Sequence, residues 1–240
     1  MPRLSAVGLD ADDTLWSHET HYRLTQDRFA DLLAPFAEPQ ALHAHLADVE
    51  ARNLAFYGYG VKGFTLSMIE TALAFAGDAA APVVREVLAA GREMLTHPIE
   101  PLPGVRSTLA AMAQRWRMVV ITKGDLIDQE RKIAASGLGE HFSAVEIVSD
   151  KTCEVYRRVF TRHGRGPAEA AMIGNSLRSD VLPALQAGAF AAHVPFTLTW
   201  AHETAEAPLG HPRFEQLERF SDAPAWLDRI ERGEAGLSPG

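Results

Sequence analysis

Residues 6–13 read Ala-Val-Gly-Leu-Asp-Ala-Asp-Asp, an apolar run that turns abruptly into a group of carboxylates. This pattern is typical of a short buried strand that emerges into a polar loop. Asp10 and Asp12 are two residues apart, so in extended chain both side chains can point the same way. Two close carboxylates repel each other, and a bound divalent cation offsets that repulsion. The stretch therefore predicts the first strand of a sheet and a charged site at its end.

The segment from about residue 20 to residue 96 shows helical spacing, because its apolar residues recur three and four positions apart, as in Leu66, Ile69 and Leu73. We expect a small bundle of four helices here, inserted between the first strand and the rest of the sheet. The proline-containing stretch 98–103 is suited to a domain boundary. The predicted domains are therefore a core domain of residues 1–16 and 98–240 and a helical domain of residues 17–97.

Beyond residue 103 the pattern alternates between helix and strand. Repeated β-α units predict an α/β fold with a doubly wound, Rossmann-like parallel sheet. The expected strands are 118–121, 144–148, 170–173 and 191–194, and the expected helices are 109–116, 128–136, 156–162, 180–186 and 223–232.

Composition narrows the classes of function. The net charge of −8 argues against a nucleic-acid or anionic-membrane partner, because such partners need a basic surface. A single cysteine, Cys153, excludes an internal disulfide and any multi-cysteine zinc site. No apolar run approaches the roughly twenty residues that a membrane span requires. We expect a cytoplasmic monomer or homodimer, and a small anionic substrate is compatible with the charge because a few local cations suffice to bind it.

In an open parallel sheet the ligand crevice lies beyond the carboxyl ends of the strands. Polar residues follow the expected strands at residues 10–14, 122–124, 150–151 and 174–180. If the sheet forms as predicted, these stretches meet at one edge.

The same stretches match a family. Asp10-Ala11-Asp12-Asp13-Thr14-Leu15, Thr122, Lys151 and Gly174-Asn175-Ser176-Leu177-Arg178-Ser179-Asp180 resemble, in order, the four motifs of the haloacid dehalogenase-like (HAD) hydrolase superfamily. The inserted helices resemble its C1-type cap domain. The resemblance implies a phosphatase that acts on a small phosphorylated metabolite and forms an aspartyl-phosphate on Asp10, with Asp12 as general acid and base. Thr122 and Lys151 would hold the phosphoryl group, and Lys123 is a rival for the lysine role.

The resemblance also implies Mg²⁺ as cofactor, held by Asp10, the Asp12 backbone carbonyl, Asn175 and Asp180. Two residues depart from the commonest motifs. Asp13 stands where glycine is usual, but aspartate tolerates tight turns. Asn175 replaces a metal-binding carboxylate, so the site has one negative charge fewer and weaker Mg²⁺ binding is expected.

The Gly-x-Gly-x-x-Gly pattern at residues 58–63 follows a helical stretch rather than a strand, so we interpret it as an interhelical loop and not as a dinucleotide site. Its neighbours Tyr57, Tyr59, Lys62 and Phe64 are candidates for substrate selection, or they simply pack the helical domain.

Other functions remain open from the sequence alone. A phosphomutase would use the same Asp10 and Asp12, and a non-catalytic module that binds a phosphate ligand would need neither. Dehalogenation needs no metal and no general acid at the second carboxylate, so Asp12 argues against it. A Gly-x-Ser-x-Gly stretch occurs at residues 236–240, but it follows the expected helix 223–232 rather than a strand, so it does not predict the nucleophile elbow of a serine hydrolase.

Overall fold

A computed structural model of the chain describes residues 4–197 and 205–234. The chain divides into two compact units. The core unit is drawn from Met1–Glu19, Ile99–Lys123 and Lys132–Gly240, and the helical unit from Thr20–Pro98 and Gly124–Arg131. The core domain predicted from the sequence includes residues 124–131, whereas in the structure these residues belong to the helical unit.

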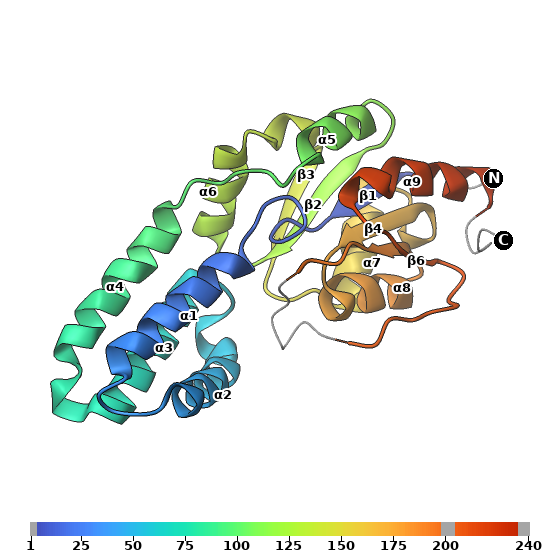
Figure 1. Cartoon of the computed structure of the whole chain (residues 1–240). Coiled ribbons are helices and arrows are strands. Elements are labelled where there is room, and N and C mark those ends of the chain that lie inside the picture. The colour runs from blue at the N-terminus through green and yellow to red at the C-terminus, as the bar shows by residue number, and fades with distance from the viewer. Residues whose placement is uncertain (1–3, 198–204, 235–240) are drawn as a thin grey trace. The chain divides into compact units, whose positions relative to one another are not determined.

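The core unit contains a parallel sheet with strand order β3-β2-β1-β4-β5-β6 among the described residues (Figure 1). Its strands are β1 (Ala6–Leu9), β2 (Met118–Lys123), β3 (Ala144–Val148), β4 (Ala170–Gly174), β5 (Phe190–His193) and β6 (Phe214–Gln216). The register pairs Leu9 with Val120 on one side and with Ile173 on the other. The first motif therefore leaves the middle of the sheet, between the carboxyl ends of β2 and β4.

Both faces of the sheet are buried, as expected for a doubly wound parallel sheet. The helices that follow its strands are α5 (Val105–Ala113), α6 (Leu126–Ser136), α7 (Cys153–His163), α8 (Leu182–Ala187) and α9 (Ala223–Arg232). Val7 and Leu9 belong to one hydrophobic cluster, which includes residues of α5 and α9. Ala6 belongs to the opposite cluster with residues of α7 and α8. This alternation follows the two-residue repeat of a strand. The predicted fold class is confirmed.

The helical unit contains α1 (Glu19–Leu33), α2 (Pro39–Tyr57), α3 (Val61–Ala76) and α4 (Ala81–Thr96). Leu42, Leu46 and Val49 of α2 are three and four residues apart and all buried, as helical spacing requires of an inward-facing stripe. In α3, by contrast, Leu66 and Leu73 of the predicted stripe are exposed, and the buried face carries Phe64 and Met68 instead.

The helices α2 and α3 end at Gly58 and Gly77, both with positive φ. The segment between α2 and α3 contains Gly58 and Gly60, so the interhelical loop predicted at 58–63 is confirmed for residues 58–60, whereas Gly63 already belongs to α3.

Three element predictions need correction. The helix expected at 109–116 is α5, which begins at Val105 because Gly104, with φ 80°, lets the chain turn into the helix. The helix expected at 180–186 begins instead with a turn of π-helix, Leu177–Val181, before α8. The strand β6 was not predicted, and with only three residues it carries too short a pattern to detect.

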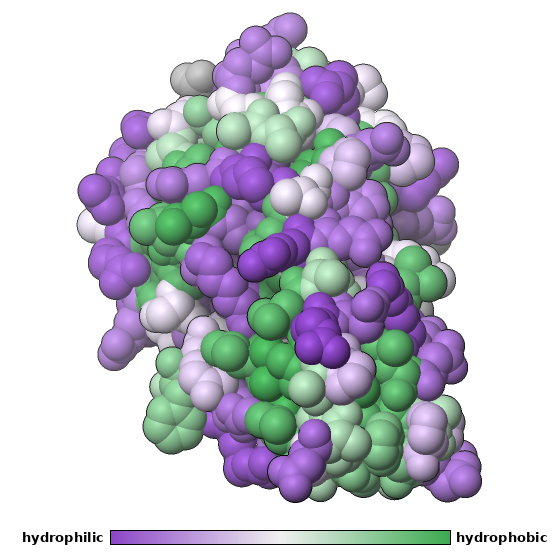
Figure 2. Space-filling view, turned by 90° about the vertical axis from the view of Figure 1, so that its left-hand side faces the viewer, coloured by the Kyte–Doolittle hydropathy of each residue, from purple (hydrophilic) through white to green (hydrophobic). Residues whose placement is uncertain are grey.

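Apolar side chains also reach the surface, where Figure 2 shows green areas among purple ones. Phe56 and Leu73 of the helical unit are among the exposed large apolar residues. No helix among the described residues is both long enough and apolar enough to cross a membrane.

Candidate active site

The loop after β1 begins with Asp10, whose backbone N–H donates to the Ile173 carbonyl at 2.9 Å and so continues the pairing with β4. The Asp10 side chain is buried, with 6% of its surface exposed. Thr14 donates its hydroxyl proton to Oδ2 of Asp10 at 2.9 Å. Thr14 thus fixes the orientation of the carboxylate and leaves Oδ1 to another partner.

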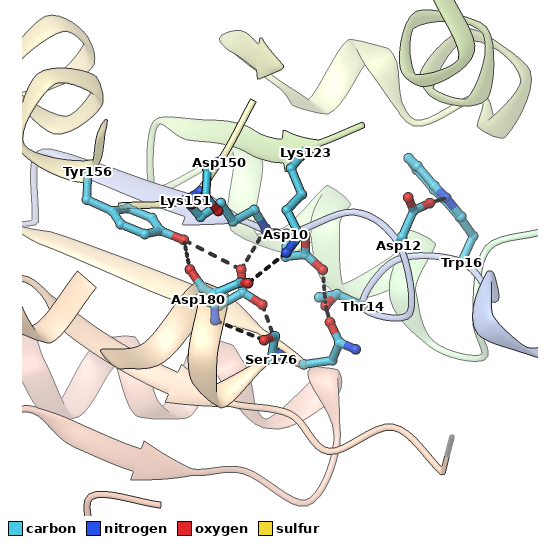
Figure 3. Close-up of polar contacts among 12 residues, drawn as sticks. Asp10, Asp12, Thr14, Trp16, Lys123, Asp150, Lys151, Tyr156, Ser176 and Asp180 are labelled. Carbon is cyan, nitrogen blue, oxygen red and sulfur yellow. Dashed lines mark hydrogen bonds and ion pairs between the residues drawn. The ribbon is translucent and has the colours of Figure 1, made fainter. Parts of the chain in front are cut away.

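That partner is Lys151, which lies just after β3. Its Nζ is 2.5 Å from Oδ1 of Asp10 and 2.6 Å from Oδ1 of Asp180 (Figure 3). All three side chains are buried. Burial and then the Asp180 carboxylate raise the pKa of Asp10 to about 7, while Lys151 lowers it. Burial alone would lower the pKa of Lys151, but Asp10 and Asp180 more than offset this and raise it above its usual range. Lys151 therefore remains an ammonium ion.

Asp180 is held by the π-helical turn after β4. Ser176 caps this turn by accepting the Ser179 N–H at 2.9 Å, and the Ser176 N–H in turn donates to Oδ2 of Asp180 at 2.9 Å. Tyr156 of α7 donates its hydroxyl proton to the Ser179 carbonyl at 2.9 Å. Both Asp180 oxygens are thus engaged, one by Lys151 and one by backbone, so Asp180 serves here to hold Lys151.

The carboxylate of Asp12 has a separate set of partners. In Figure 3 it points toward the indole of Trp16, whose Nε1 donates to Asp12 Oδ1 at 2.8 Å. Lys132 of α6 donates to both Asp12 oxygens at 3.1 Å. The same ammonium group is 3.1 Å from Nδ1 of His18. These contacts all lie within the core unit.

The oxygen atoms near Asp10 suit a hard cation. In the amide orientation that satisfies its hydrogen bonds, Asn175 donates its Nδ2 to Asp10 Oδ2 at 3.1 Å and to the Asp12 backbone carbonyl at 3.3 Å. Turning the amide over would put its oxygen in that place. Neighbouring ligands of an octahedral Mg²⁺ with bonds of about 2.1 Å lie about 3 Å apart, so these spacings fit such an ion.

Histidine and cysteine do not contribute to this donor set. Among the described residues, no group of three or more His, Cys, Asp or Glu side chains could hold a metal ion. The set that converges here combines a carboxylate, a backbone carbonyl and an amide, and such oxygen donors favour Mg²⁺ over zinc.

The two remaining residues expected to bind phosphate come from β2. Thr122 pairs with Ile147 of β3 and has 1% of its surface exposed. Lys123 is half-buried and donates to the Ser179 hydroxyl at 2.9 Å, so it supports the π-helical turn. Of the two rival lysines, Lys151 is the one that contacts Asp10.

The candidates for substrate selection lie in the helical unit. Tyr57 donates its hydroxyl proton to Glu70 at 2.9 Å, and Lys62 pairs with Asp125 at 2.9 Å. Tyr59 is half-buried. Phe64 is buried in the hydrophobic cluster of the helical unit, where its ring packs against Tyr22 at a centroid distance of 4.8 Å. Phe64 is therefore a core residue of the helical unit, which is the second of the two roles considered for it.

A family model described as haloacid dehalogenase-like hydrolase matches residues 4–188. The chain belongs to this family. A haloacid dehalogenase-like hydrolase from Xanthomonas campestris is 38% identical, with a TM-score of 0.85, over 96% of this chain and 93% of that one. The HAD hydrolase YfnB from Bacillus subtilis, solved bound to magnesium, is 14% identical, with a TM-score of 0.65, over 94% and 99% of the two chains. This second likeness shows the fold alone.

A curated relative carries a named activity. Glyceraldehyde 3-phosphate phosphatase from Methanothermobacter thermautotrophicus is 30% identical over 110 residues, which make up 43% of this chain and 48% of that protein. The HAD-like chain thus matches about half the length of this relative.

Sequence reasoning missed several residues of this HAD-like site, chiefly Trp16, Lys132 and Tyr156, and it assigned no role to Ser179 of the fourth motif. Lys132 left a weak signal, since it shares a face of α6 with Gln129 and Ser136, and all three side chains are buried. A buried polar stripe on a helix indicates polar partners, but the sequence does not say which.

Proposed function

We propose that this HAD-like hydrolase cleaves phosphate monoesters of small metabolites, with Mg²⁺ as cofactor and Asp10 as covalent nucleophile. One observation carries the proposal. The buried Asp10 carboxylate is fixed at Oδ2 by Thr14 and contacts the Lys151 ammonium through Oδ1. A carboxylate oriented from both sides and paired with a permanent cation is suited to attack an anionic group.

The first step would transfer the phosphoryl group to the enzyme. Oδ2 faces the oxygen donors suited to the cation, so we assign the attack on phosphorus to Oδ1. As the Oδ1–P bond forms, the bond between phosphorus and the ester oxygen breaks. Asp12 gives its proton to that leaving oxygen, and the alcohol departs. Lys151 offsets negative charge on the phosphoryl oxygens.

The second step would regenerate the enzyme. Water attacks the phosphorus of the aspartyl-phosphate, the carboxylate of Asp12 takes the water proton, and the P–Oδ1 bond breaks. The products are inorganic phosphate and free Asp10, and Asp12 is again protonated for the next cycle. Thr122 and backbone N–H groups at the strand ends are suited to bind the phosphoryl oxygens.

The charges around Asp10 favour binding of a divalent cation together with the substrate. The buried trio of Asp10, Asp180 and Lys151 carries two carboxylates against one ammonium, and the whole chain has a net charge of −8. A phosphate ester is itself an anion, so it needs additional positive charge to bind. Mg²⁺ would supply that charge and polarise the transferring phosphoryl group. Asp10, the Asp12 carbonyl and Asn175 would hold the ion, and Asp180 would supply negative charge to it directly or through water.

The phosphatase relative supports a phosphate ester as the substrate class. We further propose that the helical unit acts as a C1-type cap that selects the leaving group, with Tyr57, Tyr59 and Lys62 as the residues involved. Tyr57 and Lys62 are exposed and Tyr59 is half-buried, so these side chains are not committed to the hydrophobic core of the helical unit.

The decisive experiment measures phosphate release from p-nitrophenyl phosphate and from a panel of metabolite monoesters that includes glyceraldehyde 3-phosphate. Wild type is compared with Asp10→Asn, each with Mg²⁺ and with EDTA. We expect release only with both Mg²⁺ and Asp10, and a loss of at least about a thousandfold in Asp10→Asn. The matched control is Asp48→Asn, an exposed aspartate of α2, which should keep wild-type activity.

Release that persists in Asp10→Asn or in EDTA would overturn the proposed mechanism. A folded wild-type protein that releases phosphate from no ester would overturn the proposed function. The phosphomutase alternative and the binding-module alternative would then be the ones to test.

A further inference from the structure

Lys132 is a buried lysine that none of the HAD motifs accounts for. It lies in α6, and 3% of its surface is exposed. Burying an ammonium group is costly unless its hydrogen atoms find partners. The Nζ atom of Lys132 meets the two carboxylate oxygens of Asp12 and Nδ1 of His18, all at 3.1 Å. The ammonium group has three donors, and these three acceptors satisfy them.

The contacts converge on the proposed general acid and base. Oδ1 of Asp12 also accepts the indole N–H of Trp16, and Trp16 is 1% exposed within a hydrophobic cluster of the core unit. A packed ring cannot follow the carboxylate if it turns, so Trp16 is a fixed donor. Lys132 of α6 and the rigid indole donor of Trp16 therefore hold Asp12. The ionised carboxylate forms an ion pair with Lys132, and in the protonated form the carbonyl oxygen can still accept from both donors.

His18 in turn fixes Lys132. The His18 backbone N–H donates to Oδ1 of Asp13 at 2.7 Å, which anchors the residue in the loop. Its Nδ1 then lies beside Nζ of Lys132, while Asp12 occupies the other donors. The ammonium group is thus located by two residues of the first motif's loop, although it comes from a helix more than a hundred positions later in the sequence.

We propose that Lys132 is the positioning residue of Asp12, and that it sets the direction in which the Asp12 carboxyl exchanges its proton with the leaving oxygen and with water. This inference rests on the proposed phosphatase function. Lys132 does not contact the substrate in this account and acts only through Asp12, as Asp180 acts through Lys151.

A positioning role predicts a defect that depends on the leaving group. An alkoxide is a poor leaving group and needs the proton from Asp12, whereas nitrophenolate leaves readily without one. Loss of Lys132 should therefore impair cleavage of an alkyl phosphate far more than cleavage of p-nitrophenyl phosphate. A residue that merely supports the fold would impair both esters equally.

The experiment measures kcat and KM of Lys132→Met and Lys132→Arg with p-nitrophenyl phosphate and with the best alkyl ester of the metabolite panel. For Lys132→Met we expect kcat/KM to fall about a hundredfold with the alkyl ester and less than about fivefold with the aryl ester, with the loss in kcat. Lys132→Arg keeps the charge and should recover at least about tenfold. Arg158→Met, an exposed site on α7, is the control for loss of a cation.

Two further variants make the test robust. Trp16→Phe keeps the packed ring but removes the donor to Asp12, so it should show the same preference for the aryl ester even if Lys132→Met folds poorly. In the Asp12→Asn background, Lys132→Met should lower kcat/KM only slightly further, because the effects of residues that act as one unit are not additive.

Equal losses with both esters, or full additivity with Asp12→Asn, would overturn the role of Lys132 and leave the phosphatase proposal intact. Loss of the phosphatase function itself is recognised separately, since wild type would then release no phosphate from either ester.

Discussion

Asp13 has a conformation and an environment that are unusual for an aspartate. Its φ of 61° lies in the left-handed region, which glycine, asparagine and aspartate tolerate best. Its buried carboxylate accepts the His18 N–H at 2.7 Å and the Glu19 N–H at 3.1 Å. Burial nevertheless raises the pKa of Asp13 to about 8, because desolvation of the charge outweighs these hydrogen bonds. The charged form is therefore the costly one in the folded protein.

The raised pKa of Asp13 predicts how the free energy of unfolding varies with pH. The pKa of Asp13 is higher in the folded protein than its ordinary value of 3.8, so its contribution is fully present below pH 3.8 and is lost as pH rises through about 8. Asp13→Asn suits the same φ and does not titrate. From pH 5 to 8 we expect wild type to lose free energy of unfolding relative to Asp13→Asn, by at most about 1.4 kcal/mol per pH unit. Urea unfolding of both proteins across this pH range measures the difference. If the stability of wild type relative to Asp13→Asn stays constant or increases with pH, the prediction is wrong.

The sequence could indicate Asp10, Thr122, Lys151 and Asp180, because each lies at or beyond the carboxyl end of a strand that periodicity reveals. The structure places Asp10, Lys151 and Asp180 in direct contact. Partners such as Trp16 and Lys132 could not be found in this way. Trp16 looks like an ordinary core residue, and its polar role depends on a single Nε1 contact with Asp12. Lys132 lies in a helix whose packing partner depends on the completed fold.

At the scale of elements, the π-helical turn Leu177–Val181 is the device that brings Asp180 to Lys151. The extra residue in the turn is shown by the Val181 N–H, which bonds to the Ser176 carbonyl five residues earlier at 3.2 Å. Such turns are frequent at functional sites because they rotate one side chain relative to a regular helix. Gly174 at the end of β4 has no side chain, which leaves room for the Asp180 carboxylate.

Adding one methyl group at Gly174 should therefore disable the site. In Gly174→Ala the new Cβ would collide with the Asp180 carboxylate, so Asp180 and then Lys151 must move. We expect kcat to fall at least about a hundredfold, since misplacement of about 1 Å has such effects. Gly139→Ala is the matched control, because its Cβ meets nothing within 4 Å. Both variants are assayed for phosphate release and for unfolding by circular dichroism, and an active Gly174→Ala would contradict the positioning account.

Element boundaries were predictable where a single pattern determines them. The strand at 144–148 and the helix at 223–232 match β3 and α9 as predicted. The start of α5 depends on the backbone conformation of Gly104, and β6 depends on pairing with β5. Pairing of distant segments and glycine conformation are not visible in apolar periodicity, which explains why these elements were misplaced or missed.

At the scale of the whole molecule, the acidic site is a source of instability that a cation can relieve. The two buried carboxylates of Asp10 and Asp180 share one ammonium group in a chain with a net charge of −8. An ion that binds only the folded protein raises its free energy of unfolding by mass action. Stability should therefore respond to Mg²⁺, and the midpoint of that response reports the affinity of the site without any assay of activity.

Asn175→Asp tests this linkage most directly. A carboxylate at this position adds a negative charge beside Asp10 Oδ2, which is 3.1 Å from the Asn175 amide. Without Mg²⁺ the variant should be less stable than wild type, because the carboxylates repel each other. The variant should bind Mg²⁺ about tenfold more tightly than wild type. Mg²⁺ at ten times the Kd raises the free energy of unfolding by about 1.4 kcal/mol, and the variant should reach this gain at a lower Mg²⁺ concentration than wild type. Thermal unfolding across a Mg²⁺ titration measures both effects, with Asn175→Ala expected to respond least. If all three proteins respond alike, Asn175 does not hold the metal, and the cation site must be built from other oxygens.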